Sequence, residues 1–261
     1  MKLGTVVYCP PKNKLNSEAF MRNISQYKAS NPLYLISDDA AWNPSRLIKS
    51  PEMIGRKPAF AINNFIFLAA LELARDVGLT YFLWLESDSR VGCSDFDALI
   101  FSEFFERYPN GVACAGSPVC WDAPNGGKEF AMRIVEEAWR YQQASKLPLS
   151  FHGDRHPSDP SGVAYYPNGS CALYETAALL KIFAGFERDI AGYSRIITAY
   201  DLQIGRNLWN YHGPNAINHV GWLTTLYSGF GDLVVNYEER KAMLLSGRVA
   251  AVHQAKDDWT P

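Results

Sequence analysis

Residues 81–88 read YFLWLESD, and this stretch indicates the fold class more directly than any other. Its first five residues are large and apolar, which is typical of a strand buried on both faces of a parallel sheet. Two carboxylates, Glu86 and Asp88, follow immediately and are one residue apart. Because α/β proteins bind ligands beyond the carboxyl ends of their parallel strands, these acids are expected to face a binding crevice.

Strands and helices are predicted to alternate on both sides of this stretch. The expected strands are residues 5–9, 32–37, 81–85 and 112–116, and the expected helices are 16–27, 58–76 and 95–108. Pro58 suits the first turn of the long helix, and Gly78 ends it. The alternation predicts an α/β fold with a mostly parallel, Rossmann-like sheet flanked by helices.

The second half of the chain is less regular. Here the expected helices are residues 127–145, 175–183 and 201–209, the expected strands are 164–166 and 170–174, and residues 151–162 are expected to form a loop. No repeat or linker separates the halves, so a single domain over residues 1–261 is predicted.

Composition narrows the class of protein. The chain has 261 residues, of which 48% are hydrophobic and 20% charged, so it can build a substantial core. The formal net charge is -2 and Lys and Arg form no run, which argues against a dedicated DNA-binding module.

The cysteines and the N-terminus indicate a cytoplasmic protein. The five cysteines are odd in number and form no CxxC pair, so we expect reduced and mostly buried thiols. No signal peptide is recognised at the N-terminus, and no apolar run is long enough to span a bilayer. Asn23-Ile24-Ser25 and Asn168-Gly169-Ser170 match the glycosylation sequon, which would matter only in a secreted chain.

The pair Glu86 and Asp88 is a candidate site for Mn²⁺ or Mg²⁺. Hard divalent ions prefer oxygen ligands and often share them with phosphates. The alternative is that both acids are solvated loop residues. A similar pair, Asp95 and Asp97, opens a helix, and Ser94 or Asp95 as a helix N-cap explains it better than a metal does.

The run from Phe82 to Ser89 resembles the DxD region of GT-A-fold glycosyltransferases, and the order of elements around it is similar. The resemblance implies a GT-A-like domain, with a nucleotide-sugar-binding half at 1–120 and an acceptor half at 121–261. It also implies a nucleotide-diphosphate sugar as donor, a UDP-sugar being favoured, held by Mn²⁺ or Mg²⁺. Because the first acid is Glu86 rather than Asp, Asp88 is the stronger ligand candidate.

The same resemblance assigns donor contacts elsewhere in the chain. Each candidate also has an ordinary explanation, as a turn former, a solvated charge or a surface amide. The candidates for binding the nucleotide sugar are Asp38, Asp39, Arg56, Lys57, Asn64, Ser87, Asn168 and Gly169.

Two further residues complete the proposed centre. Asp201 is similar in position to the catalytic base of inverting GT-A enzymes, although Tyr200 stands where that family usually has Glu, and helix capping is the alternative role. His253 follows an apolar segment near the C-terminus, where GT-A enzymes often supply a third metal ligand. His152 and His156 are expected in a loop near the acceptor, not in a zinc site.

The sequence therefore predicts a metal-dependent, inverting glycosyltransferase that acts on a hydroxyl acceptor. A retaining mechanism is the competitor if Asp201 is not the base. A nucleotidyltransferase is disfavoured because residues 10–14, after the first strand, lack glycine. A non-catalytic sugar-nucleotide-binding module also stays open. The acceptor could be a glycan, a protein or a hydroxylated DNA base, so nucleic acid enters only as an acceptor.

Overall fold

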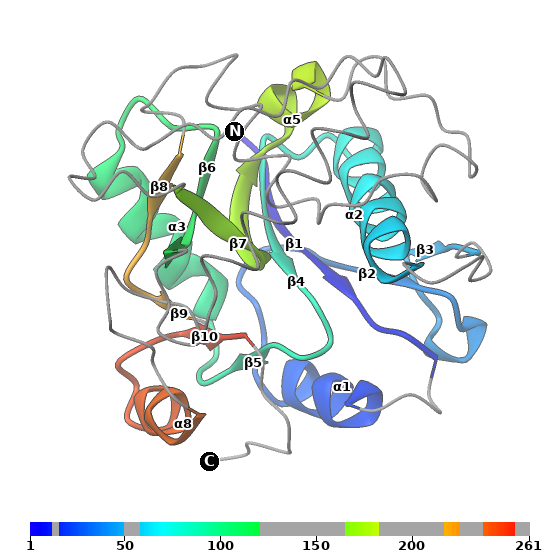
Figure 1. Cartoon of the computed structure of the whole chain (residues 1–261), viewed down its shortest axis with the longest axis horizontal. Helices are drawn as coiled ribbons and strands as arrows, with labels where there is room; N and C mark the ends of the chain where they lie inside the picture. Colours follow the sequence, from blue (N-terminus) through cyan, green and yellow to red (C-terminus); the bar gives the residue numbers. More distant parts are fainter. Residues whose placement is uncertain (12–15, 50–57, 121–164, 183–216, 225–236, 254–261) are drawn as a thin grey trace.

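A seven-stranded sheet forms the centre of the molecule, with strand order β3-β2-β1-β4-β7-β6-β8 (Figure 1). The computed structural model describes residues 1–11, 16–49, 58–120, 165–182, 217–224 and 237–253. Six of the strands run in one direction, and β7 alone runs antiparallel to its neighbours, so the predicted mostly parallel sheet is confirmed. The strands are β1 (Leu3–Tyr8), β2 (Leu33–Ser37), β3 (Arg46–Leu47), β4 (Tyr81–Leu85), β6 (Cys114–Cys120), β7 (Tyr165–Glu175) and β8 (Ile217–His219).

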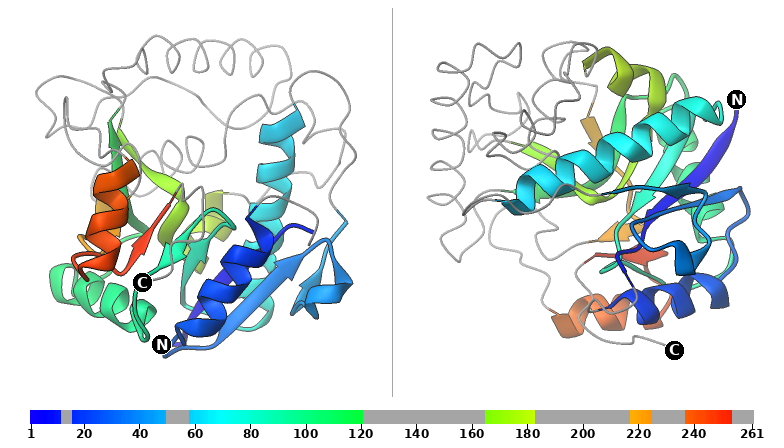
Figure 2. Two further views of the ribbon diagram at one scale, coloured as in Figure 1. Left: turned by 90° about the horizontal axis from the view of Figure 1, so that it is seen from below. Right: turned by 90° about the vertical axis from the view of Figure 1, so that its right-hand side faces the viewer.

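Helices cover both faces of this sheet, as the alternating pattern predicts (Figures 1 and 2). On one face lie α2 (Pro58–Asp76) and α5 (Thr176–Ile182). On the other lie α1 (Ser17–Gln26) and α3 (Phe96–Arg107). A short 3-10 helix, η1 (Ala40–Trp42), follows β2.

Strand β4 is apolar throughout because both of its faces are buried. Phe82 and Trp84 point into the core beneath α2, where the Phe67 ring meets the Trp84 ring edge-on at 5.8 Å between centroids. Leu83 and Leu85 point into the core beneath α1 and α3. Side chains of a strand alternate between faces, so a strand at the centre of a two-sided core has no polar position.

A smaller three-stranded sheet lies below the carboxyl end of β4 (Figure 1). Its strands are β5 (Arg90–Val91), β10 (Ala251–Val252) and β9 (Leu223–Thr224), in the order β5-β10-β9. The helix α8 (Tyr237–Leu245) precedes β10 and packs through Leu244 against Val252. This sheet joins the last described segment of the chain to the loop that follows β4.

Most predicted elements agree with the observed ones. Residues 58–76 and 81–85 have the predicted bounds, and Gly78 has the positive φ of 73° expected of a helix terminator. Cys9, Cys93, Cys114 and Cys171 are free, and of these four all but Cys93 are buried. The predicted helices 127–145 and 201–209 and the predicted loop 151–162 lie outside the described residues.

The two stretches predicted as strands, 164–166 and 170–174, are confirmed as strand over residues 165–166 and 170–174, but they belong to one continuous strand. Residues 165–175 form one strand, β7, which contains an irregularity in its pairing with β6. Gly116 pairs with Ala172 and Pro118 pairs with Pro167, so residues 168–171 stand opposite the single residue 117. Asn and Gly favour the backbone conformations of a bulge, and here they interrupt the pairing without ending the strand.

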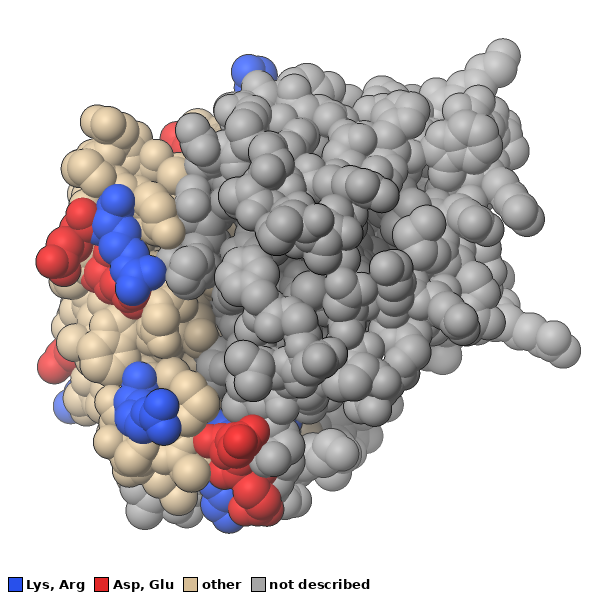
Figure 3. All heavy atoms as spheres, turned by 60° about the vertical axis from the view of Figure 1, so that its left-hand side comes forward, with Lys and Arg blue, Asp and Glu red and all other residues tan. Residues whose placement is uncertain are grey.

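The described surface carries charges of both signs. On the face shown in Figure 3, the Lys and Arg side chains of the described region lie in separate groups, some of them beside Asp and Glu side chains, and form no continuous basic strip there. Among the helices in the described ranges, none combines the length and the apolar character needed to cross a bilayer.

Candidate metal centre

The centre lies where β1, β2 and β4 end together. Val7 pairs with Leu85, and Tyr8 pairs with Ile36, so the three parallel strands finish at one edge of the sheet. The residues that follow them, Asp38 after β2 and Glu86 after β4, therefore start from the same edge. This is where ligands bind in open α/β sheets.

A tight turn carries the two candidate carboxylates. It is closed by a hydrogen bond of 2.8 Å from the Ser89 N–H to the Glu86 carbonyl. The Arg90 guanidinium is fully buried beneath the turn, and its Nη1 donates to the carbonyls of Ser87 at 3.0 Å and of Ser89 at 2.6 Å. Arg90 therefore holds the turn from within the protein.

His253 reaches this turn through the small sheet. Strand β5 begins at Arg90 and pairs antiparallel with β10, with Val252 opposite Arg90. His253 follows Val252 directly, so antiparallel pairing carries it towards Asp88. The imidazole is buried, and its Nε2 lies 3.1 Å from Oδ1 of Asp88.

The three predicted metal ligands are thus brought together from distant parts of the chain. Glu86, Asp88 and His253 can each offer one ligand atom, with all three atoms within 4.8 Å of one another. Asp88 Oδ1 is buried, and apart from its ion-pair contact with His253 it has no hydrogen-bond partner among the described residues. Buried polar atoms are rarely left in this state, and a cation is one of the groups that would satisfy such an oxygen.

The separations suit a divalent ion. Neighbouring ligands of an octahedral ion with bonds of about 2.1 Å lie about 3 Å apart, and opposite ligands lie about 4.2 Å apart. The 3.1 Å between Asp88 and His253 matches neighbouring positions, and the 4.8 Å within which all three atoms lie is somewhat longer than the span across the ion. Two carboxylates and one imidazole therefore fit a shared ion with small side-chain adjustments.

Asp88 is ionised in this setting. Burial by itself raises the pKa of the carboxyl, but the charge and hydrogen bond of a protonated His253, a backbone hydrogen bond and the charge of Arg90 together hold the pKa of Asp88 below its usual range. The side chain is accordingly a carboxylate at neutral pH, the form that binds a metal ion.

The thiols of Cys9 and Cys171, near the centre, are not expected to bind the ion. Burial raises the pKa of Cys9 to about 12. Burial also raises the pKa of Cys171, and the charges of Asp88 and Glu86 raise it further. Both thiols stay protonated at neutral pH, and thiols bind metal ions as thiolates.

A half-buried phenol holds one of the predicted nucleotide-binding acids. Tyr8, the last residue of β1, donates from its hydroxyl to Oδ2 of Asp38 at 2.8 Å. Burial raises the pKa of Tyr8 well above its usual range, and Asp38 and Glu86 add to the shift, so the phenol remains a donor. Asp39 caps η1 by accepting from the Ala41 N–H at 2.9 Å, which is the turn-forming role that the sequence left open.

The remaining predicted residues are placed only in part. Ser87 lies in the acidic turn, and the backbone of Asn64 lies in α2. Asn168 and Gly169 lie in β7 at positions past Cys171, which pairs with Leu85, so the backbone places them beyond the end of β4. Arg56, Lys57 and Asp201 lie outside the described residues, as do His152 and His156.

The second acidic pair has a structural role that differs from the predicted one. Asp95 occupies the N-cap position of α3, but with a positive φ of 61° and without a capping hydrogen bond from its side chain. Its Oδ1 instead accepts from the Ser30 hydroxyl. Asp97 is buried and accepts from the backbone N–H groups of Ser30 and Asn31, both at 2.8 Å. The pair therefore anchors the loop before β2.

Arg90 and Tyr8 are the residues of the centre that sequence reasoning missed. Arg90 stands two residues after Asp88, and a basic residue so close to an acidic motif was a usable signal. Tyr8 carried no such signal, because an aromatic residue in an apolar strand is ordinarily core.

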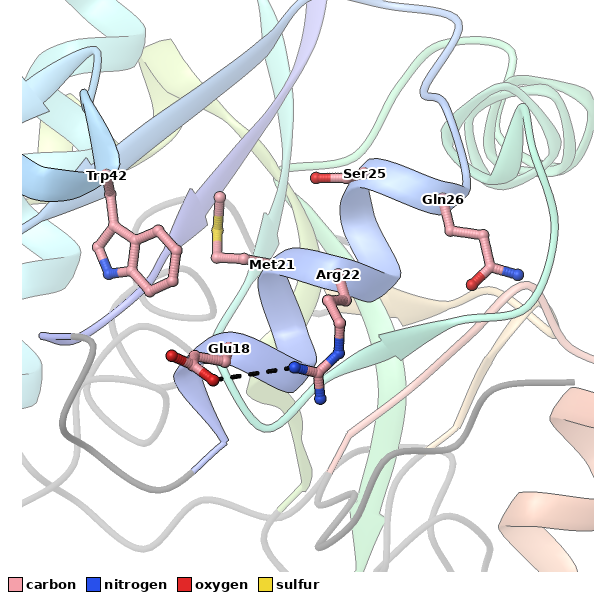
Figure 4. Close-up of a pocket in the computed structure, with 6 residues that line it drawn as sticks. All are labelled: Glu18, Met21, Arg22, Ser25, Gln26 and Trp42. Atoms are coloured by element: carbon pink, nitrogen blue, oxygen red, sulfur yellow. Dashed lines mark ion pairs between the residues drawn. The ribbon is translucent and has the colours of Figure 1, made fainter.

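A separate surface hollow of about 580 Å³ lies along α1 (Figure 4). Met21 and Trp42 supply its apolar wall, and Glu18 and Arg22 form an exposed ion pair of 3.9 Å within it. None of its lining residues belongs to the triad of Glu86, Asp88 and His253, so the hollow is distinct from the metal centre.

Comparison of the chain with family models and with curated proteins finds no match. The fold and the geometry of the centre are therefore the features that bear on function.

Proposed function

We propose that this chain is a metal-dependent glycosyltransferase of the GT-A type, which moves a sugar from a nucleotide-diphosphate sugar to a hydroxyl acceptor. The observation that carries the proposal is the triad of Glu86, Asp88 and His253 at the carboxyl edge of a mostly parallel sheet. The buried Asp88 Oδ1 lies 3.1 Å from Nε2 of His253, and a shared ion would satisfy both of these ligand atoms.

The ligand set favours Mn²⁺ over Mg²⁺. Mg²⁺ prefers oxygen ligands and water, whereas Mn²⁺ also accepts an imidazole nitrogen beside carboxylates. A bound ion would supply Lewis-acid stabilisation of the negative charge on the diphosphate leaving group. Glu86, Asp88 and His253 would hold the ion, and the buried Arg90 keeps the carboxylate turn in place.

The neighbouring strand ends suit the nucleotide part of the donor. Asp38 lies at the same edge of the sheet as Glu86. The hydrogen bond from Tyr8 fixes the orientation of the Asp38 carboxylate. A fixed carboxylate can accept hydrogen bonds from ribose hydroxyls. We assign to Asp201 the role of base that removes the proton from the acceptor hydroxyl, which makes the reaction an inversion.

The decisive experiment is a screen of nucleotide sugars for binding and hydrolysis, with and without Mn²⁺. We expect a UDP-sugar to bind with Mn²⁺ and to lose most of its affinity in EDTA. Asp88→Asn should lower Mn²⁺ affinity by about 100-fold, because it removes a charged ligand. Glu18→Gln, an exposed carboxylate on α1, is the matched control and should change nothing. Donor binding that needs no metal and survives Asp88→Asn would overturn the proposal.

The role of Asp201 has a test of its own. Asp201→Asn should keep donor and metal affinity and lower transfer by at least about 100-fold, because general-base catalysis contributes roughly this much. Single-turnover assays with purified donor separate the two effects. Unchanged transfer would remove Asp201 from the reaction and favour a retaining mechanism.

A further inference from the structure

Asn23 is a fully buried amide on the apolar face of α1. Its neighbours on that face, Phe20 and Ile24, pack into the core, whereas its own side chain reaches strand β5. Nδ2 donates to the carbonyl of Val91 at 2.9 Å, and Oδ1 accepts from the N–H of Val91 at 2.8 Å. One side chain therefore satisfies both backbone groups of a single strand residue.

In the small sheet β5 is an edge strand, and this double contact supplies hydrogen bonds on its outer side. On one side β5 pairs with β10, and on the other the Asn23 amide takes the place that a further strand would fill. Buried hydrogen bonds stabilise the fold, and a buried backbone group left without a partner destabilises it. Asn23 consequently determines where β5 lies relative to α1.

The position of β5 affects the metal centre because β5 pairs with β10, the strand that precedes His253. Val91 pairs with Ala251, and Arg90 pairs with Val252, so β5 aligns β10 in register. The residue after Val252 is His253, whose Nε2 lies 3.1 Å from Asp88. Hydrogen bonds therefore connect the Asn23 amide to the strand that delivers the histidine ligand.

We propose that Asn23 is a positioning residue of the metal centre, which holds β5 and β10 so that His253 meets the carboxylates of the acidic turn. The inference rests on the proposed metal site but not on the identity of the sugar or the acceptor. Ligand side chains that are held in place by buried partners bind metal more tightly, because they lose less conformational entropy when the ion binds.

The same contact bears on the Asn23-Ile24-Ser25 sequon. The Nδ2 atom that a glycan would modify is buried and donates to Val91. In the folded protein this nitrogen belongs to the scaffold of the metal centre and is inaccessible as a glycosylation acceptor.

The test is a double-mutant cycle read by Mn²⁺ titration calorimetry on the full chain. Asn23→Ala should weaken Mn²⁺ binding about tenfold, the lower end of the effect of losing a supporting residue. In a His253→Ala background the same change should alter affinity by less than about twofold, because the ligand that Asn23 positions is already gone. An equal loss in both backgrounds would show a general structural effect and overturn the inference.

Two control variants separate positioning from stability. Gln26→Ala removes an exposed amide from the same helix and should leave Mn²⁺ affinity unchanged. Leu179→Ala opens a cavity beneath α5 on the opposite face of the sheet, so it should lower stability without lowering metal affinity. A loss of Mn²⁺ affinity in Leu179→Ala as large as in Asn23→Ala would likewise overturn the inference.

A measurement on the unaltered protein covers the case in which Asn23→Ala does not fold. Saturating Mn²⁺ should slow amide hydrogen exchange in peptides that cover β5, because ordering His253 also orders the strand bonded to Asn23. If calorimetry detects Mn²⁺ binding but the exchange rate in β5 does not change, the proposed role of Asn23 is overturned and the metal site is not. If calorimetry detects no Mn²⁺ binding to the unaltered protein, the metal site and this inference fall together.

Discussion

Arg90 shows how one buried side chain can organise a charged site. Its guanidinium has no solvent exposure, yet it lies beside a turn that carries two carboxylates. The positive charge offsets the repulsion between Glu86 and Asp88, and the donated hydrogen bonds tie the turn to β5. Removing the buried guanidinium would leave the carboxylates and carbonyls of the turn uncompensated.

The residue-scale prediction concerns this guanidinium. Arg90→Met should lower the free energy of unfolding by about 3 kcal/mol, because it leaves the carbonyls of Ser87 and Ser89 without their donor and removes the positive charge beside the half-buried Asp88. Arg90→Lys should cost less, since it keeps the charge but lacks the fork that reaches two carbonyls. Urea denaturation followed by circular dichroism measures both.

Arg248→Met, at an exposed position before β10, is the control and should lie within about 0.5 kcal/mol of the unaltered protein. A similarly small effect of Arg90→Met would contradict the assigned role of the buried guanidinium.

Two glycines with the same backbone conformation lie in the turns that follow helices, in different surroundings. Gly78 follows α2 with a φ of 73° and has open space where a Cβ would lie. Gly111 lies between α3 and β6 with a φ of 70°, and a Cβ there would fall on the hydroxyl oxygen of Tyr81, the first residue of β4. The second connection therefore depends on glycine for two reasons, conformation and space.

At the scale of these elements, Gly78→Ala should cost about 1 kcal/mol of unfolding free energy from backbone strain alone. Gly111→Ala should cost about 3 kcal/mol, because a steric overlap is added to the same strain. Combining Gly111→Ala with Tyr81→Phe removes the overlapping oxygen and should recover most of the difference. Chemical denaturation of the single and double variants measures the coupling, and equal costs for the two single glycine changes would contradict the packing argument.

On the scale of the whole molecule, the metal centre links two segments far apart in the chain. Glu86 and Asp88 follow β4 in the first half, and His253 follows β10 near the C-terminus. An ion bound by all three would bridge the main sheet and the small sheet. Binding that requires this bridge stabilises the folded chain, because the unfolded chain does not hold the three ligands together.

The whole-molecule prediction follows from this linkage. Mn²⁺ at about 100 times its Kd should stabilise the protein by about 2.7 kcal/mol and raise Tm by roughly 5–10 °C. Scanning calorimetry measures the shift, and EDTA should reverse it. His253→Ala should lose most of the shift, whereas a full shift in that variant would exclude the histidine from the ligand set.

The sequence by itself determined the features that depend on local patterns. A run of five apolar residues at 81–85 predicts a strand buried on both faces, and the acids that follow are then expected at the carboxyl edge of the sheet. Pro58 and Gly78 mark the ends of the long helix through their own backbone preferences. Such features could be predicted because hydrophobic period and backbone preference act within a few neighbouring residues.

Only the tertiary structure decided which distant residues meet at the centre. The pairing of β5 with β10 brings His253 to Asp88, and neither two-residue strand is long enough to leave a pattern in the sequence. Asn23 and Arg90 are polar residues that local rules assign to the surface, yet both are buried because backbone groups of β5 and the acidic turn need their hydrogen bonds. Their roles depend on partners that the chain supplies from other elements, and folding alone brings those partners within hydrogen-bonding distance.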